Sequence, residues 1–99
     1  MKKVILSADG DSVIYDVPDE VADNLKRFCI RFFKWLRTSP NAGKYRTEKG
    51  YCYNEADFIE YLNKCIFPDQ QSTLVKNLGW TGLGENLPEE YQGYPYFNF

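Results

Sequence analysis

The stretch KVILSADGDSVIYDV, Lys3 to Val17, decides the fold. Its two apolar runs flank Asp9-Gly10, a dipeptide typical of two-residue hairpin turns because both residue types tolerate a positive φ. A turn there pairs Leu6 with Val13 and sets Lys3 opposite Asp16. One face of the hairpin then carries Val4, Leu6, Val13, Tyr15 and Val17. The other face carries Lys3, Ser7, Ser12 and Asp16, and because Ile5 and Ile14 interrupt it, we expect it to be partly covered.

The residues that follow have the periodicity of a long helix, predicted from Asp19 to Arg37. Pro18 stands where helices begin, and acidic residues crowd the first turn, where the helix dipole favours negative charge. Apolar residues recur at helical spacing and predict a buried stripe of Val21, Leu25, Phe28, Cys29, Phe32 and Leu36. The run Ser39-Pro40-Asn41-Ala42-Gly43 ends the helix.

A second helix is predicted after Asn54, a good N-cap residue with Asp57 three positions on. Its buried stripe is Phe58, Ile59, Leu62, Cys65 and Ile66, and Phe67-Pro68-Asp69 stops it. Residues 44–53 indicate a loop or a short irregular strand pair with its bend at Gly50. Residues 72–79 suit either a helical turn or a strand, and residues 79–90 suit a flexible connection.

The C-terminal residues are unusually aromatic: Tyr91, Tyr94, Tyr96, Phe97 and Phe99 lie among the last nine. Gly93 and Pro95 favour an extended path. We expect these rings to dock on the hairpin or between the helices, because a small domain needs large side chains to complete its core. The alternative is a linear segment that binds a partner by its rings.

These elements predict one α+β domain over residues 1–99. An N-terminal hairpin, or a three-stranded sheet, packs on two main helices, and residues 90–99 form the aromatic tail. The predicted core is Val4, Leu6, Val13, Tyr15, Leu25, Phe28, Phe32, Leu36, Phe58, Leu62 and Ile66.

The sequence contains no histidine, which excludes histidine-based triads and dyads and most zinc sites. The three cysteines, Cys29, Cys52 and Cys65, have neither a CxxC nor a disulfide spacing, so we expect free packing thiols, with Cys52 semi-buried. The acids near Asp9 lack the glycine of a calcium loop, and the glycines of residues 79–84 lack the helix start of a phosphate cradle. We therefore predict no catalytic residue, cofactor or metal, and a protein that is not an enzyme.

Charge is distributed unevenly along the chain. Residues 26–49 hold eight bases and one acid, a net charge of +7, whereas the other residues hold four bases and thirteen acids. Five of the bases fall on one flank of the first helix, and Ile30 lies near the centre of that flank. The predicted partner-binding residues are Arg27, Ile30, Arg31, Lys34, Arg37, Lys44 and Arg46.

This basic flank has more than one interpretation. We expect an acidic protein partner, and sequence-independent nucleic-acid binding is the alternative, in which Tyr45, Tyr51 and Tyr53 would stack on unpaired bases. Ile30 and Trp35 are either covered by the tail or serve as anchors in an interface, including a homodimer. A third interpretation gives the flank no binding role, so that it is only solvated or paired with the chain's own acids. Helices favour bases in their last turns, which by itself would explain the order of the charges.

Three phrases, VPDEVADNL, CYNEADFIEYLN and PEEYQGYPYFNF, resemble those of small uncharacterised accessory proteins from low-GC Gram-positive bacteria and their mobile elements. The resemblance implies a cytosolic accessory protein and no particular activity. Free thiols favour the same reducing compartment, and the apolar run after Met1 is too short for a signal peptide or a membrane span. The expected location is therefore the cytoplasm, without membrane contact.

Overall fold

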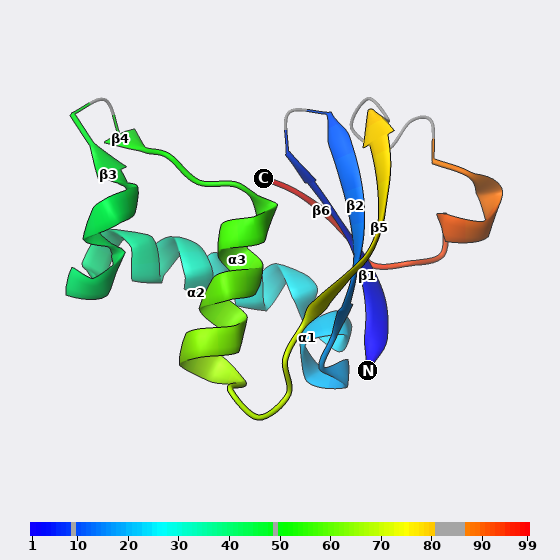
Figure 1. Cartoon of the computed structure of the whole chain (residues 1–99), viewed down its shortest axis with the longest axis horizontal. Helices are drawn as coiled ribbons and strands as arrows, with labels where there is room; N and C mark the ends of the chain where they lie inside the picture. Colours follow the sequence, from blue (N-terminus) through cyan, green and yellow to red (C-terminus); the bar gives the residue numbers. More distant parts are fainter. Residues whose placement is uncertain (9, 49, 81–86) are drawn as a thin grey trace.

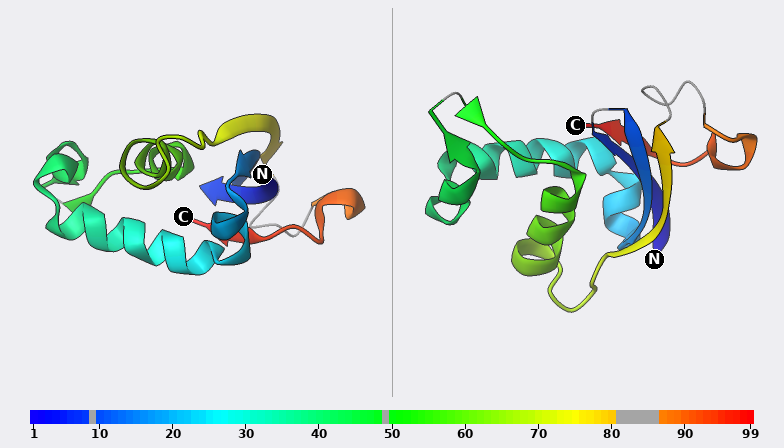
Figure 2. Two further views of the ribbon diagram at one scale, coloured as in Figure 1. Left: turned by 90° about the horizontal axis from the view of Figure 1, so that it is seen from below. Right: turned by 45° about the horizontal axis from the view of Figure 1, so that its top comes forward.

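The computed structural model describes residues 1–8, 10–48, 50–80 and 87–99. Helices gather on one side of an antiparallel hairpin that has a further strand on each edge (Figure 1). A short 3₁₀ helix, η3 (Glu89–Tyr91), lies on the opposite side of the sheet from the main helices (Figure 2). The predicted α+β fold is confirmed.

The hairpin forms in the predicted register. Strands β1 (Lys2–Ala8) and β2 (Asp11–Val17) pair Leu6 with Val13, and the Lys3 Nζ lies 3.4 Å from a carboxylate oxygen of Asp16. Gly10 has a φ of 88°, which only glycine adopts readily, and Asp9 of the predicted turn lies outside the described residues. Both faces are buried at the centre of the hairpin, because Ile5, Ser7, Ser12 and Ile14 are as inaccessible as the core face. The expected partial cover of the second face is therefore confirmed and is more complete than expected.

The described residues form a sheet of four strands in the order β5-β2-β1-β6, one strand more than the sequence suggested. Strand β5 (Thr73–Trp80) settles the ambiguity at residues 72–79 and pairs antiparallel with β2. Strand β6 (Tyr96–Asn98) runs parallel to β1. Of the connection predicted at residues 79–90, residues 81–86 lie outside the described residues.

The predicted first helix is two helices, and this prediction needs correction at Asn24. Helix α1 (Asp19–Asp23) ends there and α2 (Leu25–Thr38) begins, because Asn24 has a φ of −135° and a ψ of 39°. The Asn24 side chain donates to the carbonyl of Glu20 at 3.1 Å. An asparagine amide that bonds nearby backbone competes in this way with the helical ladder. The predicted buried stripe is nonetheless correct throughout.

The segment after α2 winds into a 3₁₀ helix, η1 (Pro40–Tyr45), and then forms the predicted short strand pair. Strands β3 (Arg46–Thr47) and β4 (Gly50–Tyr51) are antiparallel, and Gly50 at their bend has a φ of 125°. The chain then enters α3 (Glu55–Tyr61) through a complete capping box. Asn54 accepts from the backbone N–H of Asp57 at 3.2 Å, and the Asp57 carboxylate accepts from that of Asn54 at 2.9 Å.

The second helix changes its winding at its end, and the predicted buried stripe is therefore wrong at Cys65 and only partly correct at Ile66. After α3 the chain forms a wider π turn, η2 (Leu62–Ile66), in which the Phe67 N–H bonds the Leu62 carbonyl at 2.8 Å. Each residue of a π turn advances by less than the roughly 100° of an α-helix. Cys65 therefore leaves the buried stripe and is exposed, while Ile66 is only half-buried against the core.

The end of the aromatic tail completes the core, as predicted, whereas Tyr91 and Tyr94 earlier in the tail pack against each other, with ring centres 5.9 Å apart. The Phe97 and Phe99 rings pack against the buried cluster, and Phe99 lies 5.5 Å from Phe58 between ring centres. The tail also joins the sheet, because the Pro95 carbonyl accepts from Ile5 at 2.8 Å and the Phe99 N–H donates to Ser7 at 2.7 Å. At the centre of the core lies Phe32, which is fully buried.

Candidate binding surface on helix α2

The α2 surface away from the core carries the predicted cluster of bases, which we call the basic flank: Lys26, Arg27, Arg31, Lys34 and Arg37, with Ile30 among them. All six side chains are exposed, and Ile30 retains 53% of its accessible surface. Every one of them follows the break at Asn24, so that break leaves their common flank intact. The stretch between Arg27 and Arg37 therefore builds the core with one side and a cationic surface with the other.

Within the described residues, no carboxylate pairs with any base of the flank, although lysines elsewhere do form ion pairs. Asp23 and Arg27 have the i,i+4 spacing of a helical ion pair but do not pair, because the break at Asn24 lies between them. Asp23 instead accepts from Lys2 at 2.7 Å, which ties α1 to the sheet. The contacts of the flank are modest, and the clearest is the Arg31 guanidinium, 5.2 Å from the ring centre of Phe28.

Lys44 and Arg46, the other two predicted binding residues, have partners within the fold. The Lys44 Nζ lies 3.4 Å from Glu60 and 4.9 Å from the ring centre of Tyr45. Arg46 donates to the carbonyls of Leu36 at 2.9 Å and of Ser39 at 2.7 Å. Arg46 thus supplies a donor to the Leu36 carbonyl in the last turn of α2. It is also a second donor to the Ser39 carbonyl, which accepts from the Ala42 N–H at 3.1 Å.

This position of Arg46 predicts a stability role. Replacing Arg46 with alanine should lower the free energy of unfolding by about 1 kcal/mol, because the Leu36 carbonyl loses its side-chain donor and the Ser39 carbonyl loses one of its two donors. Urea denaturation followed by circular dichroism measures the change. Arg37→Ala is the matched control, since Arg37 is an exposed arginine near the same helix end and should change stability by less than about 0.5 kcal/mol. Equal effects of the two substitutions would refute the capping role.

A hollow of about 320 Å³, which we call the Trp35 pocket, opens between α2, η1 and the α3–η2 helix. Trp35 and Tyr61 lie side by side in it, with ring centres 5.1 Å apart. Its rim carries Lys44 and Lys64, whose ammonium groups lie 3.4 and 2.6 Å from the same Glu60 oxygen.

The bond from Lys64 lowers the pKa of Glu60, with a further contribution from Lys44. Burial raises the pKa of Tyr61, and the nearby positive charge of Arg31 partly opposes this.

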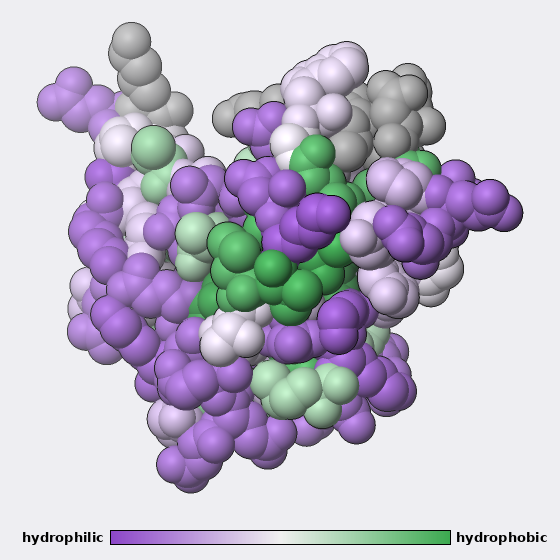
Figure 3. Space-filling model, turned by 45° about the vertical axis from the view of Figure 1, so that its right-hand side comes forward, coloured by the Kyte–Doolittle hydropathy of each residue, from purple (hydrophilic) through white to green (hydrophobic). Residues whose placement is uncertain are grey.

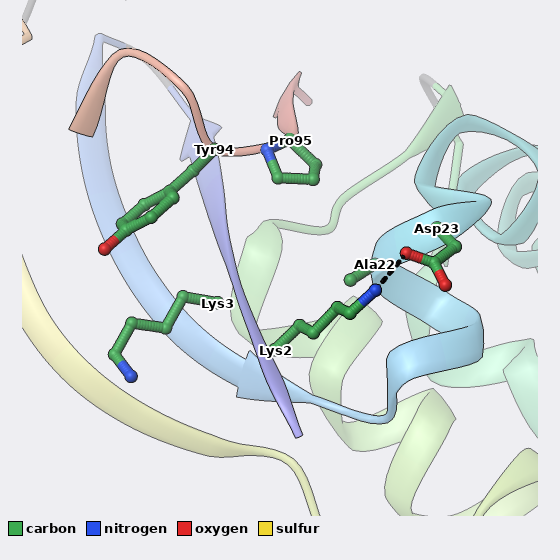
Figure 4. A pocket seen from close by; sticks show the side chains of 6 residues that line it. All are labelled: Lys2, Lys3, Ala22, Asp23, Tyr94 and Pro95. Carbon is green, nitrogen blue, oxygen red and sulfur yellow. Dashed lines mark hydrogen bonds and ion pairs between the residues drawn. The ribbon is translucent and has the colours of Figure 1, made fainter.

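A larger hollow, about 460 Å³, lies where the tail leaves the edge of β1 (Figure 4). Lys2, Ala22, Asp23 and Pro95 lie on one side of that strand, and Lys3 and Tyr94 lie on the other. Lys2 pairs with Asp23, and Lys3 pairs with Asp16. Because each lysine has its own carboxylate, this hollow offers no surplus charge to a ligand.

Strand β5 carries exposed apolar side chains at the sheet edge: Leu74, Val75 and Trp80. Figure 3 shows hydrophobic side chains gathered in the middle of this side of the molecule, with hydrophilic ones around them. The register of β5 against β2 shifts twice along its length, and exposed Lys76 lies between the shifts. Irregular pairing and a lysine are devices that keep an edge strand from adding another strand. The edge of β5 is thus poorly suited to strand addition.

The tyrosines expected near the basic flank differ in how far their rings are exposed for stacking on a base. Tyr45 is buried, and Tyr53 packs against Phe32 and Phe33. Tyr51 keeps 45% of its surface exposed, beside a shallow hollow of about 110 Å³ that Arg37 also lines. Base stacking by Tyr45 or Tyr53 would therefore require part of the core to open.

The cysteines likewise differ from one another. Cys29 is fully buried as predicted, and burial raises the pKa of its thiol to about 12. Cys52, expected to be semi-buried, is exposed, because it lies in the extended approach to Asn54. Cys65 is exposed at the Trp35 pocket.

Sequence reasoning missed the Trp35 pocket, although part of its signal was available. Glu60 and Lys64 have the i,i+4 spacing of a helical ion pair. The approach of Lys44 to the same carboxylate depends on how η1 folds back against α3, which no local pattern specifies.

Among the described residues, no group of three or more Cys, Asp or Glu side chains is placed to hold a metal ion. The helices in this part of the chain also fall short of the length and apolarity that a membrane crossing requires. Comparison of the chain with protein-family models, curated proteins and solved structures found no match.

Proposed function

We propose that this protein is a non-enzymatic interaction module that binds an acidic protein partner through the basic flank of α2. The observation that carries the proposal is the contrast in pairing. Lys2, Lys3, Lys44 and Lys64 have carboxylate partners, whereas the five bases of the flank, all exposed, have none within the described residues. A carboxylate-rich surface would supply the missing partners, and such complementarity guides both encounter and register.

Exposed Ile30 supports a protein partner in particular. A solvent-exposed isoleucine among cations provides a small apolar contact that a protein surface can cover, with charged pairs around it. Interfaces commonly have this organisation, in which an apolar centre is enclosed by a polar rim.

The proposal is tested by reversing the charge of the flank. The unmodified protein should form a cross-link to its partner in its native cells, and the variant Arg27→Glu/Arg31→Glu/Lys34→Glu should not. The affinity of this variant for the purified partner should be reduced about tenfold or more. Lys34→Glu and Lys76→Glu form a matched pair, because both lysines are exposed, neither forms an ion pair with a described residue, and both substitutions change the charge equally. Only Lys34→Glu should weaken binding. Undiminished binding by the triple variant would contradict the proposal.

Sequence-independent nucleic-acid binding is the second candidate. The same five bases support it, together with exposed Tyr51 near Arg37, since an aromatic ring beside cations is the combination that binds single strands. Fluorescence anisotropy with a random single-stranded oligonucleotide at two salt concentrations separates the candidates. Nucleic-acid binding predicts affinity that falls steeply with salt, and no affinity at low salt would eliminate it.

A further inference from the structure

The Trp35 pocket adjoins the basic flank. Trp35 belongs to α2 itself, and Arg31 of the flank lies four residues before it, about one turn away on the same helix. A partner lying along the flank would therefore reach the pocket without leaving α2. If the proposed function is correct, the lining of the pocket therefore determines which side chain the partner carries there.

The pocket's floor favours an aromatic side chain. The Trp35 ring is half-buried and lies within 6.2 Å of the ring centres of Phe32, Tyr45 and Tyr61. A further ring placed on the half-buried Trp35 would extend this cluster, at separations where aromatic pairs attract. A volume of about 320 Å³ is at the lower limit of sites that enclose whole small molecules, and it suits a single inserted side chain.

The pocket's rim favours negative charge beside that ring. Lys44 and Lys64 share one carboxylate, so the rim retains one positive charge, and Arg31 adds another about one helical turn from Trp35. The aromatic rings and Glu60 would by themselves attract a cation. A cationic occupant is nevertheless disfavoured, because the ammonium groups of Lys44 and Lys64 would repel it. The charge balance thus selects an anionic segment.

We propose that the Trp35 pocket receives an aromatic side chain of the acidic partner, while carboxylates that flank this side chain in the partner's sequence pair with Lys44, Lys64 and Arg31. The aromatic residue is the anchor, and the flanking acids provide its orientation.

The test uses the full chain and two synthetic peptides that have glutamates on both sides of a central residue, either phenylalanine or alanine. The Phe peptide should bind roughly tenfold more tightly than the Ala peptide, as expected for an interface anchor. Bound Phe peptide should also slow the alkylation of Cys65 by iodoacetamide, as followed by mass spectrometry. Cys52 is the internal control, because it is exposed and does not line the pocket, and buried Cys29 should stay unmodified.

Two further variants test the pocket without removing any side chain of the core. Cys65→Phe adds a ring at an exposed position of the rim and should abolish the preference for the Phe peptide, whereas Lys76→Gln on β5 should preserve it. If both peptides bind equally and Cys65 stays unprotected, the pocket is not an anchor site, and the basic flank alone binds acids. If neither peptide binds at low salt, the proposed function fails together with the inference.

Discussion

A chain that ends at Gln92 is expected to lose its cooperative fold. The truncation removes β6 with its pairing to β1, and it removes the Phe97 and Phe99 rings from the core. Replacing a buried phenylalanine with alanine costs about 3–5 kcal/mol, and even half of this for each ring is a large part of the roughly 5–15 kcal/mol that stabilises a small domain. The remaining chain would also expose the edge of β1 to water.

Near- and far-ultraviolet circular dichroism and urea denaturation measure this loss. Phe99→Ala should give an intermediate effect, since Phe99 contacts Phe32, Phe33, Phe58 and Phe97. Asn98→Ala is the control, because Asn98 is the exposed neighbour of Phe99 at the end of β6. A truncated protein as stable as the full chain would show that the tail is dispensable and would favour its use as a binding segment.

The parts of the fold that the sequence predicted correctly depend on local chemistry. The hairpin register follows from Asp9-Gly10 and the alternation around it, and the start of α3 follows from Asn54 and Asp57. Two of the errors arose where one side chain competes with the helical ladder or where the winding changes. The break at Asn24 and the exposure of Cys65 are of this kind, since neither alters the apolar periodicity from which a helix is predicted.

The candidate surface was predictable for a similar reason. Helical periodicity alone places Arg27, Arg31 and Lys34 on one flank, and α2 has the expected winding. Whether the chain's own acids pair with these bases depends on tertiary structure. Asp23 pairs with Lys2 instead, and Glu60 pairs with Lys44 and Lys64. The same long-range packing assigns Arg46 to the end of α2 and creates the Trp35 pocket.

Replacing Phe32 with alanine is expected to lower the free energy of unfolding by about 3–5 kcal/mol, the usual cost of deleting a fully buried phenylalanine. The residue is 0% exposed. Its ring lies within 6.2 Å, between ring centres, of Phe33, Trp35, Tyr53, Phe58, Tyr61 and Phe99. These neighbours come from α2, from the approach to α3, from α3 itself and from the tail, so one cavity would weaken the packing of α2 against both α3 and the tail.

Thermal denaturation measures the effect, which should lower the melting temperature by about 12 °C or more in a domain of this size. Phe32→Leu, which keeps most of the volume, should cost roughly 1.5 kcal/mol or less if the core repacks. Ile30→Ala is the informative control, because Ile30 lies two residues away on the exposed side of the same helix and should change stability by less than about 0.5 kcal/mol. A similar loss in Phe32→Ala and Ile30→Ala would contradict the division of α2 into a core side and a free side. If the proposed function is correct, Ile30→Ala should instead weaken partner binding. Of these two apolar residues of one helix, Phe32 would then contribute to stability and Ile30 to recognition of the partner.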